Sequence, residues 1–393
     1  MKKLLDVMSS FGLSVAIFAL LTLITWLGTL AQADIGLFRA QEKYFESWLI
    51  AQQVIGPVYV PLPGGLLLMV TLFANLVLGG LWRMKWRWDK AGILITHFGM
   101  LFLLFAGFWK YAFAEEGGLQ LFEGMRSSEY VSYYDWEIVI EEAAGDEVRS
   151  WVVPDTAFDD RTGRDRVAEI QADGLPFVLE VSHFMPHSTV RRAGPMVDRG
   201  PHVADGFALE AREMEKEAEA NVAGCVAVVR PTDGNRATHG ILWGRALYPW
   251  TVEVGDRTFG VTLRKKRMPM PFEIHLDKFT HEYHPNTRIP RKYMSDVTVR
   301  DDAGPVAHKI RMNEPLRQDG MIVFQSSWGP TDARPGDRLY SGFSVVRNPA
   351  DKWPEYSLWV IVSGMLIHFV MRLFRFILRE TAPTKKAPEE AVA

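Results

Sequence analysis

The sequence predicts a membrane protein with four transmembrane helices and a large, mainly β extracytoplasmic domain. Although 23% of the 393 residues are charged, four long runs contain no Asp, Glu, Lys or Arg: Val7 to Ala33, Ser47 to Trp82, Ala91 to Trp109 and Tyr356 to Met371. A membrane-spanning helix needs about 20 mostly apolar residues. Between the third and fourth runs, short β-branched and aromatic stretches alternate with turn residues, which is typical of strands.

These runs divide the chain into membrane and outer regions. We expect spans at about 10–30, 64–82, 91–113 and 356–376. In the second run, Pro57, Pro61 and Pro63 precede Gly64 and Gly65, so only the part after Gly65 should cross. The expected organisation is a membrane region over 1–113, an outer domain over 114–355, a closing span over 356–376 and a disordered cytoplasmic tail over 377–393.

Basic residues near the span ends predict the orientation. One cluster precedes the first span: Lys2 and Lys3. A second links the second span to the third: Arg83, Lys85, Arg87 and Lys90. The third follows the fourth span: Arg372, Arg375, Arg379, Lys385 and Lys386. With four spans all three clusters fall on one side, which we take as the cytoplasm. Lys2-Lys3 and Ala31-Gln32-Ala33 resemble a signal peptide, but the apolar run between them is too long for one, and we expect it to remain as a span.

Two outer segments are expected to be helical. Phe38, Phe45 and Leu49 share a helix face, so 34–63 should hold a short amphipathic helix that lies either on the outer membrane surface or against the protein. Phe207 to Val222, rich in Ala, Glu and Met, should be a solvent-facing helix. The rest of the outer domain reads as a sandwich or open barrel. Its expected strands are Trp136–Glu142, Pro176–Val181, Val226–Arg230, Thr251–Val254, Phe259–Leu263 and Phe272–Leu276, with turns at 232–235, 254–256 and 301–304.

Two of the ten histidines, His97 and His368, lie inside predicted spans. Ionisable residues within a membrane are functional candidates. Counted from Lys90 and Arg372, both lie roughly 6–11 Å from the cytoplasmic edge at 1.5 Å per residue. Two imidazoles at similar depth suit axial ligation of haem iron. The alternative is that each bonds a helix carbonyl or a nearby hydroxyl.

The other candidate residues are expected to have structural roles or to lie in solvent. His275, His281 and His284 match no standard zinc spacing and are expected to be solvated. Trp86-Arg87-Trp88-Asp89 lies in a short basic loop and suits interfacial anchoring. The one cysteine, Cys225, excludes an internal disulfide, a CxxC pair and a covalent c-type haem site of this chain's own, and should be a buried apolar residue. The net charge of −3 argues against a nucleic-acid partner.

Several blocks resemble a known family. They are Leu27-Gly28-Thr29-Leu30, Ser47-Trp48, Ala74-Asn75-Leu76-Val77, His97 with Leu119-Gln120-Leu121-Phe122-Glu123-Gly124, Leu276-Asp277-Lys278-Phe279 with Glu282-Tyr283, Pro290 to Ser295, Met312-Asn313-Glu314-Pro315-Leu316 and Phe324-Gln325-Ser326-Ser327. In their order and in the predicted topology, they are similar to the ResB-like family of System II cytochrome c biogenesis. About 140–265 matches little, Glu314 is an insertion into its block, and His281 and His284 fall outside the pattern.

The resemblance implies a bacterial inner-membrane protein that transports haem b non-covalently with a ResC-like partner and supports its attachment to CxxCH apocytochromes. It maps the family's transmembrane haem ligand onto His97, whereas His368 matches no family motif. Because the sequence shows no phosphate loop, nucleophile elbow or acid pair, we expect no catalysis by the chain alone, only a role as a subunit of a cytochrome c synthase (haem lyase) complex. The outer domain would shield haem or position the apocytochrome. The alternative function is a membrane-anchored, cofactor-free scaffold that binds extracytoplasmic proteins; a transporter fits less well.

Overall fold

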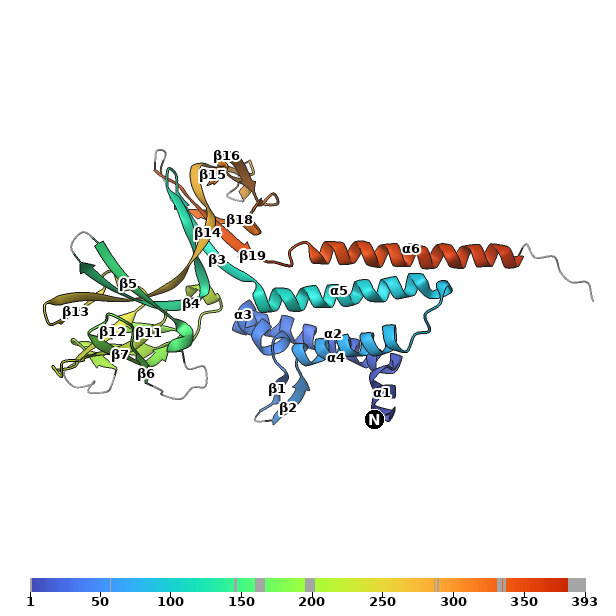
Figure 1. The fold of residues 1–393 in the computed structure, drawn as a ribbon, viewed down its shortest axis with the longest axis horizontal. Helices are drawn as coiled ribbons and strands as arrows, with labels where there is room; N and C mark the ends of the chain where they lie inside the picture. The colour runs from blue at the N-terminus through green and yellow to red at the C-terminus, as the bar shows by residue number, and fades with distance from the viewer. Residues whose placement is uncertain are drawn as a thin grey trace, which may run out of the picture. The chain divides into compact units, whose positions relative to one another are not determined.

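The computed structural model describes residues 2–56, 58–144, 147–159, 167–194, 202–285, 287, 290–330, 334 and 337–380. The chain forms two compact units (Figure 1). The helical unit comprises Met1–Ala114 and Asn348–Ala393, and the β unit comprises Glu115–Arg347. Four helices are long and apolar enough to cross a membrane, and the β unit is built mainly from strands, so the predicted fold class is confirmed.

The helical unit contains the four candidate spans. Its helices are α1 (Lys2–Met8), α2 (Phe11–Ile35), α4 (Gly65–Asn75) continued by the π-helical segment η2 (Leu76–Trp82), α5 (Ala91–Phe113) after the short turn η3 (Trp88–Lys90), and α6 (Trp353–Glu380). A break separates α1 from α2, where Ser10 caps α2 by accepting a hydrogen bond from the backbone N–H of Leu13. Helix α6 continues to Glu380, so the prediction of disorder is wrong for 377–380, while 381–393 lie outside the described residues.

The segment between α2 and α4 is only partly helical. A short helix, α3 (Leu37–Ala40), passes into the π-helical segment η1 (Gln41–Phe45), and the hairpin β1 (Leu49–Ile55) and β2 (Val58–Pro63) follows. The predicted stripe is therefore wrong at Leu49, which lies in a strand with 69% of its surface exposed. Tyr44 is the buried residue, and its hydroxyl donates to Gln52 Oε1 at 2.6 Å. The prolines of β2 cannot continue a helix, which explains the change to extended chain.

The β unit consists of β3 (Glu115–Phe122), β4 (Arg126–Ala144), β5 (Glu147–Pro154), β6 (Ala168–Ile170), β7 (Phe177–Met185), β8 (Ser188–Arg192), β9 (Val203–Ala204), β10 (Phe207–Ala211), β11 (Gly224–Pro231), β12 (Thr238–Trp243), β13 (Trp250–Val254), β14 (Arg257–Tyr283), β15 (Pro290–Asp301), β16 (Gly304–Arg311), β17 (Leu316–Gln318), β18 (Met321–Gly329) and β19 (Tyr340–Arg347), with 3₁₀ turns η4 (Asp155–Ala157) and η5 (Ala218–Ala220). The largest sheet has the order β16-β15-β14-β4-β3-β19-β18-β17, with β13 and β5 added beside β14 and β4. Smaller sheets have the orders β12-β11-β7-β6 and β8-β10-β9.

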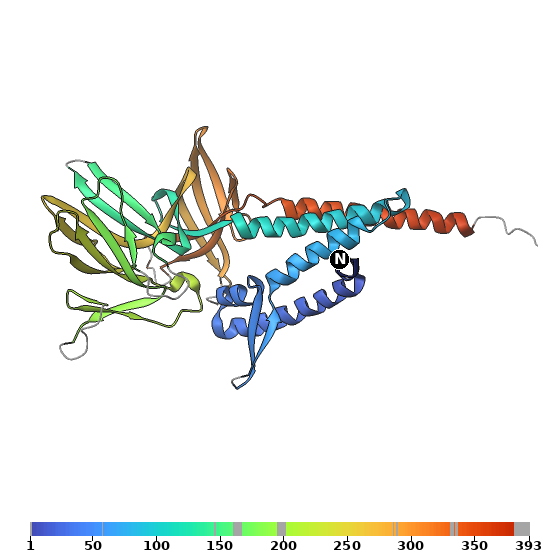
Figure 2. The ribbon, with the colours of Figure 1, turned by 60° about the horizontal axis from the view of Figure 1, so that its bottom comes forward.

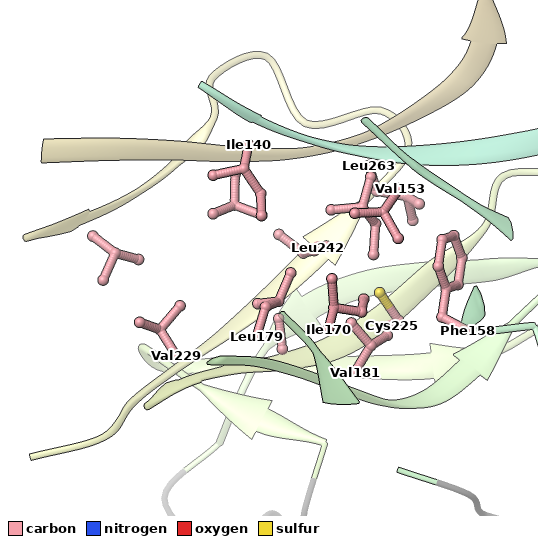
Figure 3. Packing of buried hydrophobic residues seen from close by; sticks show 14 of the residues in the cluster. Ile140, Val153, Phe158, Ile170, Leu179, Val181, Cys225, Val229, Leu242 and Leu263 are labelled. Carbon is pink, nitrogen blue, oxygen red and sulfur yellow. The ribbon is translucent and has the colours of Figure 1, made fainter. Parts of the chain in front are cut away.

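Two hydrophobic cores lie along the long strands β4 and β14. In the first core, the sheet β12-β11-β7-β6 packs face to face on the β5-β4-β14 part of the large sheet, which is a β-sandwich (Figure 3). Ile140 and Leu263 approach from one layer, and Leu179 and Val229 from the other. Cys225 lies in this core with none of its surface exposed, as predicted, and burial raises its thiol pKa to about 12.

The second core is enclosed by a curled part of the large sheet. Its members come from β3, β4 and β14 to β19 and include Phe272, Val297, Val323 and Phe343. The buried Ser295 hydroxyl on β15 lies 2.9 Å from that of Ser341 on β19 and also bonds Gln325 on β18. Strands distant in the sheet order therefore meet inside the curl, which explains why one domain has features of both a sandwich and an open barrel.

The strand predictions are confirmed, and one helix prediction is wrong. Five of the six predicted strands lie within β4, β11, β13 or β14, and the sixth begins one residue before β7. The three predicted turns connect β11 to β12, β13 to β14 and β15 to β16. Residues 207–222 instead form β10, which pairs with β8 and β9, and the single turn η5. Asp205 and Gly206 have φ of 52° and 77° and make a tight hairpin from β9 to β10. Strand pairing across this turn outweighs the helix propensity of the Ala- and Glu-rich stretch.

Candidate functional site

Helices α5 and α6 meet along a row of small residues that we call the glycine seam: Gly92, Thr96 and Gly99 on α5, with Ser357 and Gly364 on α6. A Cβ atom added at Gly92 would lie 2.5 Å from the His368 backbone nitrogen, and one added at Gly99 would lie 2.7 Å from Ile361 Cγ1. These pairs define an antiparallel arrangement, and the two helices run side by side in Figures 1 and 2. Small residues permit such backbone contact between membrane helices.

A buried amide connects the start of the chain to α4. Asn75 is 5% exposed. Its Oδ1 accepts from Ser14 Oγ at 2.7 Å, and its Nδ2 donates to the carbonyl oxygens of Met8 and Ser10 at 2.8 and 3.1 Å. The amide is therefore well satisfied in an otherwise apolar setting, where an unpaired polar group is costly. Asn75, which lies in one of the blocks that resemble the family, therefore has a structural role at the junction of α1, α2 and α4.

The His97 ring lies against the π-helical segment η2. A Cβ atom added at Gly80 would lie 2.5 Å from His97 Cδ2, so glycine leaves the space that this ring fills. The Nδ1 atom lies 2.7 Å from the carbonyl oxygen of Ile93, one turn earlier on α5. When Nδ1–H donates to that carbonyl, Nε2 keeps its lone pair, which is the form of histidine that ligates metals. The two interpretations left open by the sequence, carbonyl bonding and iron ligation, are thus compatible in one tautomer.

His368 lies on a different side of α5. Its backbone contacts Gly92 in the glycine seam, and its ring is 5.8 Å from that of Phe369. His97 follows Gly92 by five residues, about 140° further around the helix, and faces η2. The structure therefore gives the two predicted ligands different neighbours, His97 beside α4 and η2 and His368 beside the start of α5.

Charged pairs connect the three basic clusters at one end of the helical unit. Arg83 lies 3.1 Å from Asp6 of α1, and Arg375 of α6 lies 3.7 Å from Asp89 before α5. Trp82, Trp86 and Trp88 at this end are 82%, 76% and 91% exposed. Exposed tryptophans beside basic residues are typical of a membrane–water interface. Among the described residues, one end of the unit thus brings Arg83 beside α1 and Arg375 beside the start of α5, as the predicted orientation requires.

Five aromatic side chains of the β unit form a group that we call the aromatic stack: Phe279, His281 and Tyr283 on β14, Tyr293 on β15 and Trp328 on β18. His281 is stacked on Trp328 with 4.4 Å between ring centroids and 18° between planes. His281 is therefore half-buried within a group of rings and not a freely solvated side chain, and Tyr283 beside it is 40% exposed. The signal in the sequence was the alternation Phe279-Thr280-His281-Glu282-Tyr283, which puts three rings on one strand face.

A cavity of about 330 Å³ lies between β3, β4, β14, β18 and β19, and its mixed lining includes the polar residues Lys265, Tyr133, Gln120, Ser326 and Ser327. Lys265 Nζ donates to the Tyr133 carbonyl oxygen at 2.6 Å and lies 4.4 Å from the centroid of the Trp136 ring. Burial lowers the pKa of Lys265 to about 8, although Asp135 and Glu219 oppose the shift. Burial likewise raises the pKa of Tyr133. Neither Lys265 nor Tyr133 is among the candidate residues predicted from the sequence.

The remaining candidate histidines, His275 and His284, lie near the surface of the β unit. His275 Nδ1 lies 2.8 Å from Asp277 Oδ1 near the surface, and His284 is exposed. Within the part of the chain that the structure describes, no group of three or more His, Cys, Asp or Glu side chains is arranged to hold a metal ion. Zinc sites normally need at least three such ligands.

No curated protein matches this chain. The sequence model of the ResB-like family matches residues 249–336, which run from the start of β13 through β18 and include every member of the aromatic stack. The resemblance of this chain to the ResB-like family is thereby confirmed over residues 249–336.

Proposed function

We propose that this chain is a cytochrome c biogenesis subunit that exports haem with a ResC-like partner and supports haem attachment to CxxCH apocytochromes. The observation that carries the proposal is the match of residues 249–336 to the ResB-like family, which implies involvement in cytochrome c biogenesis. Four helices suited to a membrane and a large β unit agree with such a role. Haem is the cargo in this proposal, and the apocytochrome is the recipient.

His97 is the proposed axial ligand of the transported haem iron. Its ring is held by Gly80 on one side and by the Ile93 carbonyl at Nδ1, which leaves Nε2 as the ligating atom. A haem-iron ligand needs a ring of fixed orientation and tautomer, and the hydrogen bond between Nδ1 and the Ile93 carbonyl would fix both. His368 is the second candidate, but its backbone is packed on Gly92, away from the side on which His97 lies. We therefore favour a second ligand from the partner protein.

The proposed orientation puts the basic end of the helical unit in the cytoplasm of a bacterium and the β unit outside. Support comes from the described members of the basic clusters, since Arg83 pairs with Asp6 of α1 and Arg375 of α6 pairs with Asp89. Haem would then meet His97 a short distance above the cytoplasmic face, before it reaches the outer side for attachment.

An absorption spectrum of the detergent-purified chain, co-expressed with its partner, tests the function. We expect a Soret band and a reduced α-band that are lost in His97→Ala and return when imidazole is added. His368→Ala is the matched control, because it removes the other membrane imidazole, and it should keep the spectrum. Full expression of the wild-type complex without haem would contradict the proposal.

The role of the outer domain needs a point substitution for its test. A deletion of residues 140–265 would cut through both β4 and β14 and so remove strands of both cores. Trp328→Ala instead removes the central ring of the aromatic stack at the surface of the β unit. If this domain positions the apocytochrome, the variant should retain haem while cytochrome c maturation falls at least tenfold; Trp86→Ala is the control outside the β unit.

The second candidate is a cofactor-free scaffold that binds extracytoplasmic proteins. It is favoured by an apolar cavity of about 680 Å³ whose lining includes Leu247 and Tyr248, which are 91% and 82% exposed. Exposed apolar surface of this kind marks protein-binding regions. Haem binding that is lost in His97→Ala distinguishes the two functions, because a cofactor-free scaffold binds no haem.

A further inference from the structure

A bulge in β7 re-aims the side chain of His183. In the pairing of β11 with β7, Gly224 is opposite Met185 and Val226 is opposite Ser182, so His183 and Phe184 together face Cys225 alone. His183 adopts φ of 51°, a left-handed conformation that a residue other than glycine adopts only at some energetic cost. Bulges of this type redirect side chains and are common at functional sites.

A second imidazole meets His183 at this point. The His202 ring, directly before β9, has its centroid 5.5 Å from that of His183, with 69° between the planes. The backbone of His202 is fixed by a 3.0 Å hydrogen bond from the Leu209 N–H to its carbonyl oxygen. Its Nδ1 atom is buried and, within the described part of the chain, has no hydrogen-bond partner. An unpartnered buried nitrogen in an ordered ring requires an explanation.

The separation of the two rings fits a shared metal ion. A nitrogen bound at about 2.0 Å puts the ring centroid about 3.2 Å from the metal. Two imidazoles on one trigonal or tetrahedral ion then have centroids roughly 5.2–5.5 Å apart. The observed separation of the His183 and His202 centroids, 5.5 Å, lies at the upper end of this range. His183 Nδ1 lies 3.2 Å from Ser182 Oγ, so donation to the hydroxyl leaves His183 Nε2 as the free ligand atom.

Met185, two residues after His183 on β7, offers a thioether in the same region. Met185 and His202 line the same cavity of about 430 Å³, together with Glu210 and Arg212. Glu210 is held by an ion pair with Arg191, and the Arg212 guanidinium disfavours a highly charged ion in this cavity. The described residues offer no third His, Cys, Asp or Glu to this pair, which argues against zinc. Two imidazoles with a thioether instead suit the monovalent, soft cuprous ion.

We propose that His183, Met185 and His202 form a Cu(I) site in the sandwich part of the β unit, independent of the proposed haem function. His183 binds through Nε2, His202 through Nδ1, and Met185 through its sulfur. The site needs neither the membrane helices nor haem, because all three residues come from β7 and the start of β9 within the β unit.

The test is a competition titration of the full-length, detergent-purified chain with Cu(I) against the chromogenic chelator bathocuproine disulfonate, without oxygen. We expect one tightly bound Cu(I) per chain. His183→Ala and His202→Ala should each weaken binding by about 100-fold and Met185→Leu by about tenfold. His239→Ala is the matched control, since His239 is an exposed histidine on the neighbouring strand β12, and it should bind as the wild type does. The same titrations on Cys225→Ala test whether the chain's single thiol contributes to copper binding.

X-ray absorption of the Cu(I)-loaded protein tests the ligands directly, so the result does not depend on whether the histidine variants fold. We expect nitrogen scatterers at about 2.0 Å and a sulfur at about 2.3 Å, with the sulfur lost in Met185→Leu. Met185→Leu conserves volume, so it should fold normally. Failure of the wild type to compete with the chelator, equal affinity in His202→Ala, or an unchanged sulfur signal in Met185→Leu would each overturn the site.

Discussion

The half-buried ammonium of Lys265 should make the stability of the β unit depend on pH. Burial lowers its pKa from 10.5 to about 8. Below pH 8 both folded and unfolded chains are protonated, and the folded state carries the full cost of the buried charge. Between pH 8 and 10.5 the unfolded chain holds a proton that the folded chain has released, so stability rises with pH across this window.

The size of the rise follows from the shift in pKa. One pKa unit corresponds to about 1.4 kcal/mol, which gives about 3 kcal/mol as an upper limit for this group. Lys265 is partly open to the cavity, so solvent screening reduces the expected rise to roughly 1–2 kcal/mol. The variant Lys265→Met keeps most of the apolar contact with Trp136 and lacks the charge. The free energy of unfolding of the wild type, relative to that of the variant, should therefore rise by this amount from pH 7 to 10.5.

The assay is pulse proteolysis of the detergent-solubilised chain in a urea series at each pH, scored on the fragment that contains the β unit. This method reports the fraction unfolded. Lys278→Met, at an exposed position of the same strand, is the control for the loss of a positive charge and should follow the wild type. Parallel stability curves for the wild type and Lys265→Met between pH 8 and 10.5 would refute the argument that this ammonium is buried.

Three further predictions concern the core, the glycine seam and the orientation. Phe259→Ala, at a fully buried ring, should lower the free energy of unfolding of the β unit by about 3–5 kcal/mol in the same assay, and a loss under 1 kcal/mol would contradict it. Gly364→Leu should lower the melting temperature of the helical unit in detergent, whereas Gly107→Leu, at a position with open space, should not; equal effects would argue against the seam. In a Cys225→Ala background, cysteine at Arg379 should react with an impermeant maleimide only after the membrane is permeabilised, and labelling of intact spheroplasts would reverse the orientation.

The sequence predicts features that depend on local composition and misses those that depend on distant pairing. The four spans follow from uncharged runs, and Gly255 marks the hairpin between β13 and β14 because it supplies the φ of 65° that the turn requires. Residues 207–211 have the composition of a helix, yet β8 provides a pairing partner that no local signal reveals. Propensity is a weak preference that tertiary contacts override.

The candidate site was predictable only in part for the same reason. His97 is identified by its position in a span, but the glycine that receives its ring, Gly80, lies on another helical segment. His281 looks like a surface residue until Trp328 of β18 is brought beside it. His183 and His202 are separated by a stretch of chain without an obvious pattern, and only the bulge at β7 brings their rings together.

The antiparallel pairing of β3 with β19 has an entropic consequence for the helical unit. These strands are the first and last of the β unit, and Glu115 is directly opposite Arg347. For a flexible connection of roughly 230 residues, joining α5 to α6 would cost about 5 kcal/mol in loop-closure entropy. Once β3 and β19 have paired, the ends of that connection are neighbours, and α5 and α6 associate as though joined by a short hairpin loop. Replacing residues 115–347 with a few flexible residues should therefore leave the α5–α6 pair able to form.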